Sequence, residues 1–157
     1  MTLYEENILD NLKSYIETGL ATHLAAIEQQ EGDGVRLPDL RKIVIGEADI
    51  FKLNRYPAML LFPEEIVYND LHTRADSLDI TIAGIVVVKG AKTENLVTKV
   101  TRYIAAIRYL IDADRTLSAA VDNCYVERVR YSARPPGAED FMVTEIIFVA
   151  SKEVIRP

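Results

Sequence analysis

The sequence has a single cysteine, two histidines and no tryptophan. Cys124 has no second thiol with which to form an intramolecular disulfide or a cysteine zinc site, so we expect the chain to be made in a reducing, cytosolic place. The strand pattern around Cys124 favours a small core residue over a reactive thiol. His23 lies on the apolar face of a helical pattern and His72 in a polar stretch, and neither has the spacing of a zinc motif.

Motifs of known catalytic chemistry are missing as well. Gly90 to Thr93 lies between a predicted strand and a predicted helix, as a phosphate-binding loop does, but Ala91 and Val86 stand where that motif needs glycine. The closest approaches to a catalytic carboxylate pair are Glu64 with Glu65 and Asp76 with Asp79, where no histidine or lysine is placed by sequence to shift their pKa values. We therefore predict no enzyme, with no catalytic residue, no cofactor and no metal ligand.

Long apolar runs and a local excess of basic residues are also lacking. No segment approaches the roughly 20 apolar residues that a membrane span needs, and the acidic first ten residues do not look like an export signal. The net charge of −6 lies entirely in residues 1–33, which hold seven acidic residues and one lysine. We expect no membrane association and no tight sequence-specific nucleic-acid binding.

Residues 3–31 predict a helix, because their apolar residues recur along one broad face. Thr2 is the expected N-cap. A second face carries an acidic ridge, which we interpret either as a solvated surface or as a docking surface for a basic partner or a neighbouring subunit. The members of this acidic ridge are Glu6, Asp10, Glu17, Glu28 and Glu31.

The middle of the chain predicts strands and one further helix. Residues 94–111 have the cleanest helical pattern, with an apolar stripe that should pack flat on a sheet and with Thr93 as the expected N-cap. Residues 64–77 are polar and without a period, which predicts a long functional loop that includes at most a short strand at 66–68. Strands are predicted at residues 41–51, 56–62, 78–88, 121–134 and 141–155, the last two joined by a turn at 135–140.

These elements predict one domain over residues 1–157 with an α+β fold. We expect a mixed, mainly antiparallel sheet, with the N-terminal helix (3–31) and the central helix packed on it, and with the sheet and central helix lying within residues 41–155. In the strand at 121–134, strict alternation puts Tyr125 and Val129 on one face and Arg128, Arg130 and Arg134 on the other. This row of arginines either faces solvent, lines a channel or meets a neighbour's acidic ridge.

The order of the elements resembles the tail-terminator, or tail-completion, proteins of tailed phages and related contractile particles. The likeness covers the acidic helix, the segment from Arg55 to Phe62, the polar loop, the strand from Asp79 to Val88, the helix from Glu94 to Ile111 and the hairpin from Tyr125 to Val149. It implies an α/β subunit of a six-membered ring that caps the tail tube and joins it to the head or neck.

The resemblance further implies tail-tube and head–tail connector proteins as partners, a place in the virion after synthesis in the host cytoplasm, and DNA passage through the ring. By the same likeness, residues 64–77 and the hairpin tip at 134–140 would contact the tube or an adjacent ring. The candidate subunit or partner contacts are Glu6, Asp10, Glu17, Glu28, Asp70, His72, Arg74, Arg128, Arg130 and Arg134.

Two other functions stay open at this point. One is a small α+β enzyme or ligand-binding domain with a site made by Asp70, His72, Arg74 and Asp76, which would require these side chains to converge in a deep cleft. The other is an adaptor domain that binds another protein as a monomer or dimer, which solution mass would separate from a ring.

Overall fold

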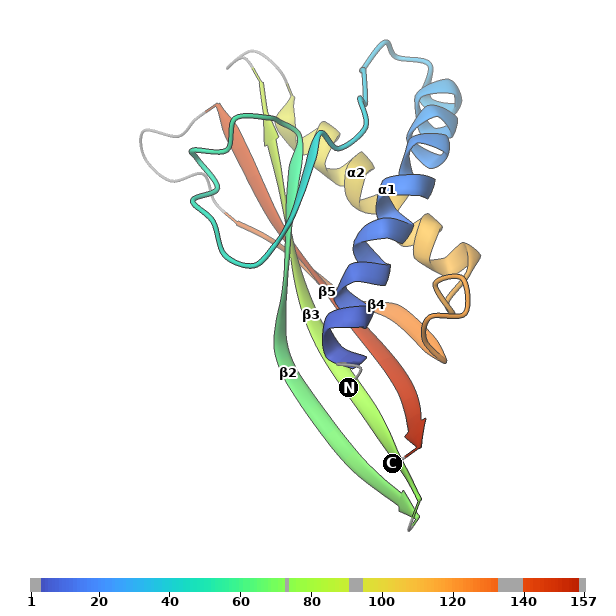
Figure 1. The fold of residues 1–157 in the computed structure, drawn as a ribbon. Coiled ribbons are helices and arrows are strands. Elements are labelled where there is room, and N and C mark those ends of the chain that lie inside the picture. Colours follow the sequence, from blue (N-terminus) through green and yellow to red (C-terminus); the bar gives the residue numbers. More distant parts are fainter. Residues whose placement is uncertain (1–3, 73, 91–94, 133–139, 156–157) are drawn as a thin grey trace.

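The computed structural model describes residues 4–72, 74–90, 95–132 and 140–155, and these form two helices and one five-stranded sheet (Figure 1). The fold is α+β, as predicted. Its elements are α1 (Tyr4–Glu31), β1 (Lys42–Ile45), β2 (Ala58–His72), β3 (Ala75–Lys89), α2 (Leu96–Ala113), β4 (Asn123–Tyr131) and β5 (Phe141–Ile155).

The sheet has the strand order β1-β2-β3-β5-β4. β1 runs parallel to β2 and every other neighbouring pair is antiparallel, so the sheet is mixed and mainly antiparallel. The ladder between β3 and β5 is unbroken from Ala75 and Ile155 to Lys89 and Phe141. The long apolar run in β3 therefore lies in the centre of the sheet, which explains why it lacks polar alternation.

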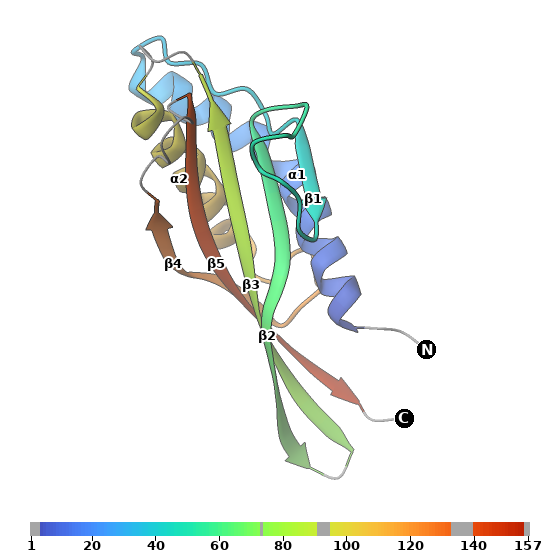
Figure 2. The same ribbon diagram turned by 90° about the vertical axis from the view of Figure 1, so that its left-hand side faces the viewer.

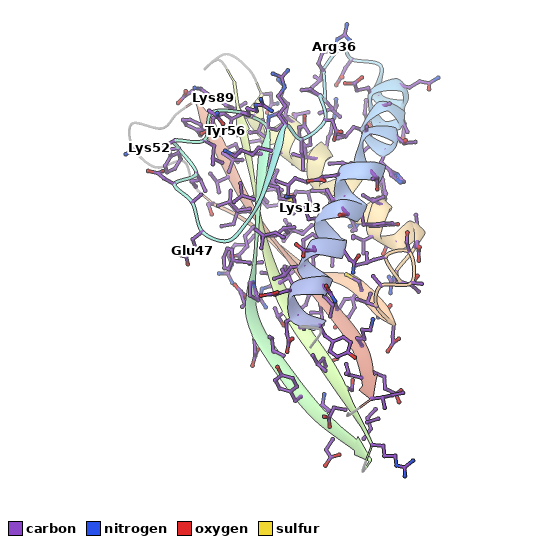
Figure 3. The ribbon with its side chains drawn as sticks, viewed as in Figure 1. Lys13, Arg36, Glu47, Lys52, Tyr56 and Lys89 are labelled. Carbon is purple, nitrogen blue, oxygen red and sulfur yellow. The ribbon has the colours of Figure 1, made fainter. Side chains whose placement is uncertain are left out.

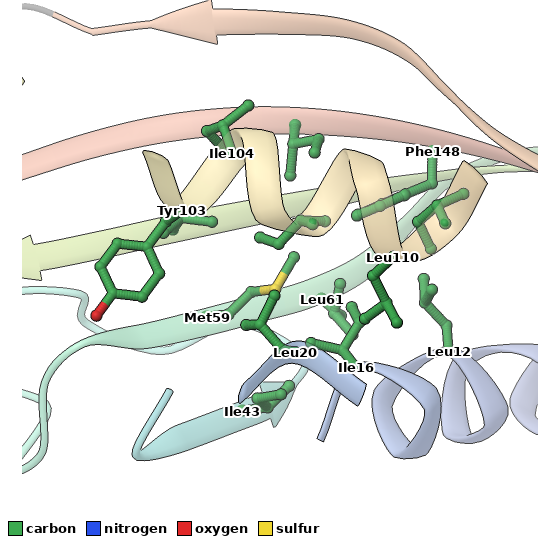
Figure 4. Packing of buried hydrophobic residues seen from close by; sticks show 14 of the residues in the cluster. Leu12, Ile16, Leu20, Ile43, Met59, Leu61, Tyr103, Ile104, Leu110 and Phe148 are labelled. Carbon is green, nitrogen blue, oxygen red and sulfur yellow. The ribbon is translucent and has the colours of Figure 1, made fainter. Parts of the chain in front are cut away.

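Both helices pack on the same face of the sheet, which we call the helix face; the other is the open face. α1 lies over β1 and β2, and α2 lies over β3, β5 and β4 (Figure 2). The helices approach closely at Gly19, where an added Cβ would lie 2.5 Å from Cδ1 of Leu110. The Tyr15 hydroxyl also donates a hydrogen bond to the Leu110 carbonyl (2.9 Å). Leu110 of α2 faces Ile16 and Leu20 of α1 in the core (Figure 4).

The predicted helices are confirmed, but their expected caps are not. Thr2 and Thr93 both lie outside the described residues. The N-cap of α2 is Asn95 instead, whose side-chain oxygen accepts a hydrogen bond from the Thr98 backbone N–H (3.1 Å). Asparagine caps a helix as well as threonine does, because both side chains can accept that bond.

The predicted loop at 64–77 is wrong: this segment is the outer part of the β2–β3 hairpin. The ladder continues from Pro63 and Ile82 out to His72 and Ala75, with irregularities near Glu64 and Leu71. We call residues 64–72 and 74–79 the hairpin arm; it projects beyond the helices (Figure 1). Its backbone is satisfied by pairing across the hairpin, so it forms strands although its side chains are polar.

The first predicted strand is shorter than expected, because β1 ends at Ile45 and Gly46 follows with φ 112°. The loop of residues 46–57 then lies against the open face of the sheet (Figure 1). Phe51 and Tyr56 from this loop pack edge-on against the Phe141 ring, with centroids 5.3 and 5.2 Å away. These contacts fix the loop to the sheet near the start of β5.

The predicted faces of the fourth strand are partly wrong. A β-bulge between Val126 and Arg128 adds one residue to the strand, so Cys124, Val126 and Val129 all pack toward the helix face. Tyr125, by register, lies opposite Val149 on the open face and not on the same side as Val129. Arg128 and Arg130 remain on the open face, so the expectation that these two arginines share a side is confirmed.

Candidate functional site

The acidic ridge of α1 is exposed in its N-terminal half. Glu6, Asp10 and Glu17 are exposed, and Glu17 forms an ion pair of 3.8 Å with Lys13. At 100° per residue these three acids lie on the side of α1 opposite Tyr15 and Gly19, which contact α2. α1 lies beside β1 and β2 (Figure 2), so the side of α1 that faces away from α2 borders the β1–β2 edge of the sheet.

Glu28 has a different role from the other acids of the ridge. It is half-buried, and its carboxylate accepts a short hydrogen bond from the Leu37 backbone N–H. This bond holds the segment that follows α1 against the end of the helix. Glu28 thus stabilises the chain reversal after α1 and is poorly placed to contact a partner.

Asp33, just beyond α1, is tied to α2. Its two carboxylate oxygens accept hydrogen bonds from the Arg102 guanidinium at 2.9 and 2.5 Å, and Arg102 also lies 3.9 Å from Glu31. The hydrogen bonds from Arg102, with one from the Val35 backbone, lower the pKa of Asp33 to about 2. Part of the N-terminal negative charge is therefore neutralised within the fold.

The Asp33–Arg102 pair predicts a pH-dependent contribution to stability. Because the folded-state pKa of Asp33 is depressed, the contribution is present above the ordinary pKa near 3.8 and is lost as the pH falls through about 2. We expect Arg102→Gln to lower the melting temperature much more at pH 6 than at pH 2, where about half of the Asp33 carboxyl is protonated in the folded state. Arg108→Gln is the matched control, since Arg108 is an exposed arginine of the same helix. Thermal unfolding at both pH values tests this; an Arg102→Gln effect that is equal at both would contradict it.

Two of the three predicted arginines project from β4 at the edge of the sheet opposite β1. Arg128 is exposed and lies 3.6 Å from Glu127, while Arg130 is exposed and pairs in register with Glu145 of β5. Arg134 lies outside the described residues. Within the part of the chain that the structure describes, no strand pairs with the outer side of β4, so these side chains lie at an open sheet edge.

The hairpin arm carries the other predicted residues. Asp70 and Arg74 are exposed near its end, and the backbone of His72 pairs with Ala75. A projecting hairpin does not enclose these residues in the cleft that an enzyme or ligand-binding site would need. The Tyr68 hydroxyl donates a hydrogen bond of 2.6 Å to Glu5, which braces the arm against the start of α1.

Sequence reasoning missed an apolar surface on the arm and on the adjacent end of β5. Val67, Leu71 and Ile155 are 42%, 50% and 74% exposed, and the register places Ile155 at the outer end of the β3–β5 ladder. β1 pairs with β2 only at Ala58–Leu61, so the outer edge of β2 along the arm is also bare. Within the polar stretch, the sequence signals for this surface were the short apolar run at 66–68 and the isolated Leu71.

The described residues offer little for covalent or metal chemistry. No three His, Cys, Asp or Glu side chains among them come together as metal ligands would. The Cys124 thiol is buried, which raises its pKa to about 12. The Tyr103 hydroxyl donates a short hydrogen bond to the Pro38 carbonyl, and burial raises its pKa. Neither helix in the described ranges is sufficiently long and apolar to cross a membrane.

No family model matches the chain, and no curated protein matches it. Among solved structures, it is similar to a chain in the virion of a native gene transfer agent particle. The two share 14% sequence identity over 88% of this chain and 94% of the other, with a TM-score of 0.39. A likeness this distant says nothing about function.

Proposed function

We propose that the protein is a structural virion assembly protein: a tail-terminator subunit that forms a homohexameric ring, caps the tail tube and joins it to the head or neck. The order of the elements, which resembles that family, supports the proposal. On this proposal the protein resides in the virion, tail-tube and connector proteins are its partners, and DNA passes through the ring.

The observation that carries the proposal is the placement of opposite charges at opposite edges of the sheet. The ridge acids Glu6, Asp10 and Glu17 border the β1–β2 edge, whereas Arg128 and Arg130 project at the β4 edge. A closed ring needs head-to-tail contacts between two different patches of one subunit. The acidic ridge of one subunit meets the arginines of the next, so that every subunit makes the same contact around the ring.

The hairpin arm supplies the contact with the tube or an adjacent ring. It projects past the helices, and Val67, Leu71 and Ile155 expose apolar surface there. Exposed apolar side chains next to bare strand edges are typical of surfaces that another protein covers. The Tyr68–Glu5 hydrogen bond holds the arm in one orientation relative to α1, which suits a contact that must be repeated around a ring.

Charge reversal tests the ring contact. We expect the wild-type protein to form rings at low salt, and expect Arg128→Glu with Arg130→Glu to reduce it to monomers, because like charges then face each other across the interface. Adding Glu6→Lys and Asp10→Lys to the same chain should restore the rings. Native mass spectrometry and negative-stain images measure the outcome.

The control for this experiment is Glu47→Lys with Glu153→Lys added to the same Arg128→Glu, Arg130→Glu chain. Both control residues are exposed and the charge change is identical, but neither belongs to the acidic ridge. Rescue by the control pair would show that net charge, not the ridge, governs assembly. A wild-type protein that is monomeric at every concentration and salt tested would count against the ring itself.

A further inference from the structure

A small basic hollow lies where β1 begins and the loop of residues 46–57 ends. Its volume is about 260 Å³, and it is lined by Arg41, Lys42, Asn54 and Arg55. Three cationic side chains and one amide therefore line a single depression, and no carboxylate does so. Such a lining is unexpected in a chain with a net charge of −6.

The backbone fixes the two halves of the hollow against each other. The Arg41 N–H donates a hydrogen bond of 2.9 Å to the Pro57 carbonyl, and Lys42 pairs in parallel register with Ala58. The Tyr56 hydroxyl donates to the Ile50 carbonyl (2.8 Å), which closes the loop on itself. The Tyr56 ring packs edge-on against Phe141, and the Lys89 ammonium lies 5.7 Å from the Tyr56 centroid, so the loop is anchored on the open face (Figure 3).

The cations of the hollow lack the acidic partners that several other cations of the fold have. Among the described residues Arg41 and Arg55 form no ion pair, and Lys42 reaches only the Asn54 side-chain oxygen at 3.4 Å. The nearby acids are engaged elsewhere. Asp49 pairs with Lys52 at 3.7 Å and accepts from the Phe51 N–H, while Asp39 accepts from the Leu40 N–H.

By contrast, cations elsewhere have local counter-charges: Arg102 has Asp33, Lys89 has Asp140 and Arg115 has Asp112. Three like charges held around one depression repel one another unless an anion lies between them. A single carboxylate would balance only one of the three. A multiply charged oxyanion matches both the charge and the supply of N–H donors, since arginine forks pair well with phosphate oxygens.

We propose that this hollow binds phosphate groups, with Arg41 and Arg55 gripping the oxygens and with Lys42 and Asn54 completing the donor set. The phosphates come either from a free oligophosphate or from the backbone of a nucleic acid. Binding at the hollow is independent of base sequence, because each lining side chain would contact phosphate oxygens and not the edges of bases. The site does not depend on ring formation and so stands apart from the function proposed above.

The test uses the full chain at low salt in a buffer without phosphate, with pyrophosphate and a short DNA duplex as probes in isothermal titration calorimetry. We expect Arg41→Gln with Arg55→Gln to weaken pyrophosphate binding by about tenfold or more, since two charge-assisted hydrogen-bonding groups are lost. Arg36→Gln with Arg108→Gln is the matched control, because it removes the same charge from other exposed positions outside both the hollow and the proposed ring contact, and it should bind pyrophosphate as the wild type does.

The two probes distinguish the sources of phosphate. If the duplex binds, if pyrophosphate displaces it and if its binding weakens with salt, the natural ligand of the hollow is a nucleic-acid backbone. Pyrophosphate binding without duplex binding assigns it to free oligophosphates. Equal losses in the two double variants, or a wild type that binds neither probe, would overturn the proposal. All four arginines are exposed, so equal melting temperatures of the variants should confirm that they fold.

Discussion

Phe148→Ala is expected to lower the free energy of unfolding by about 3–5 kcal/mol, the range for truncating a buried aromatic residue. Phe148 is completely buried in β5 on the helix face, where the central sheet meets α2 (Figure 4). Its ring fills the space above Gly84 of β3, since a Cβ added to Gly84 would lie 3.0 Å from the ring carbon Cε2. The cavity left by the substitution cannot collapse easily, because β3 and β5 are held by a continuous ladder. Urea denaturation monitored by circular dichroism measures the loss.

Phe51→Ala is the matched control for that substitution. Phe51 is 39% exposed and packs at one edge of Phe141, so its truncation removes less buried area and opens no enclosed cavity. We expect a loss well below that of Phe148→Ala. If the two substitutions cost the same, the core would not be centred beneath α2 as described.

The helices and the central strands could be predicted because their burial has a period. The buried residues of α1 run from Ile8 to Ile27 along one face, and those of α2 from Leu96 to Ile111. A helix that covers a sheet must repeat apolar residues at about 3.6 positions, so the sequence shows the pattern directly. β3 and β5 likewise lie in the middle of the sheet, and their apolar runs are sufficient to identify them.

The hairpin arm could not be predicted in this way, because hydropathy does not record backbone pairing. Its β2 half pairs only with β3 and is largely exposed, its β3 half pairs with both β2 and β5, and irregularities near Glu64 and Leu71 break the alternation. The bulge near Glu127 has a related effect in β4. One extra residue moves Tyr125 to the face opposite Val129. The amino-acid sequence of the strand does not indicate that this bulge is present.

The charged surfaces were predictable in composition but not in detail. The concentration of acids in residues 1–33 indicates an acidic ridge. The sequence does not show, however, that Glu28 accepts a hydrogen bond from the Leu37 N–H, because this contact forms only when the chain reverses after α1. The basic hollow could not be predicted for the same reason. Arg41 and Arg55 become neighbours because β1 and β2 pair in parallel, and neither segment alone indicates that pairing.

Cys124 is expected to react with thiol reagents at pH 8 at least about a thousandfold more slowly in the folded protein than in the unfolded chain. The thiolate is the reactive form, and burial raises the pKa of this thiol from its ordinary value near 9 to about 12. At pH 8 this shift alone lowers the thiolate fraction about a thousandfold. Cys124 is also completely buried on the helix face, so the reagent cannot reach the sulfur without local opening. Labelling rates with and without urea measure the ratio.

A control with an exposed thiol shows whether burial, and not some other property of the protein, slows the labelling of Cys124. In a Cys124→Ala chain, Ser132→Cys places a thiol at an exposed position just after β4, where it should react almost equally fast in the folded and unfolded states. If folded Cys124 reacts as fast as this control, the packing of β4 under α2 must open readily, and the sulfur would be accessible to partners. If it reacts only as fast as the whole chain unfolds, Cys124 reports global stability. The same labelling experiment would then measure how much Phe148→Ala speeds unfolding, because each opening event exposes one thiol.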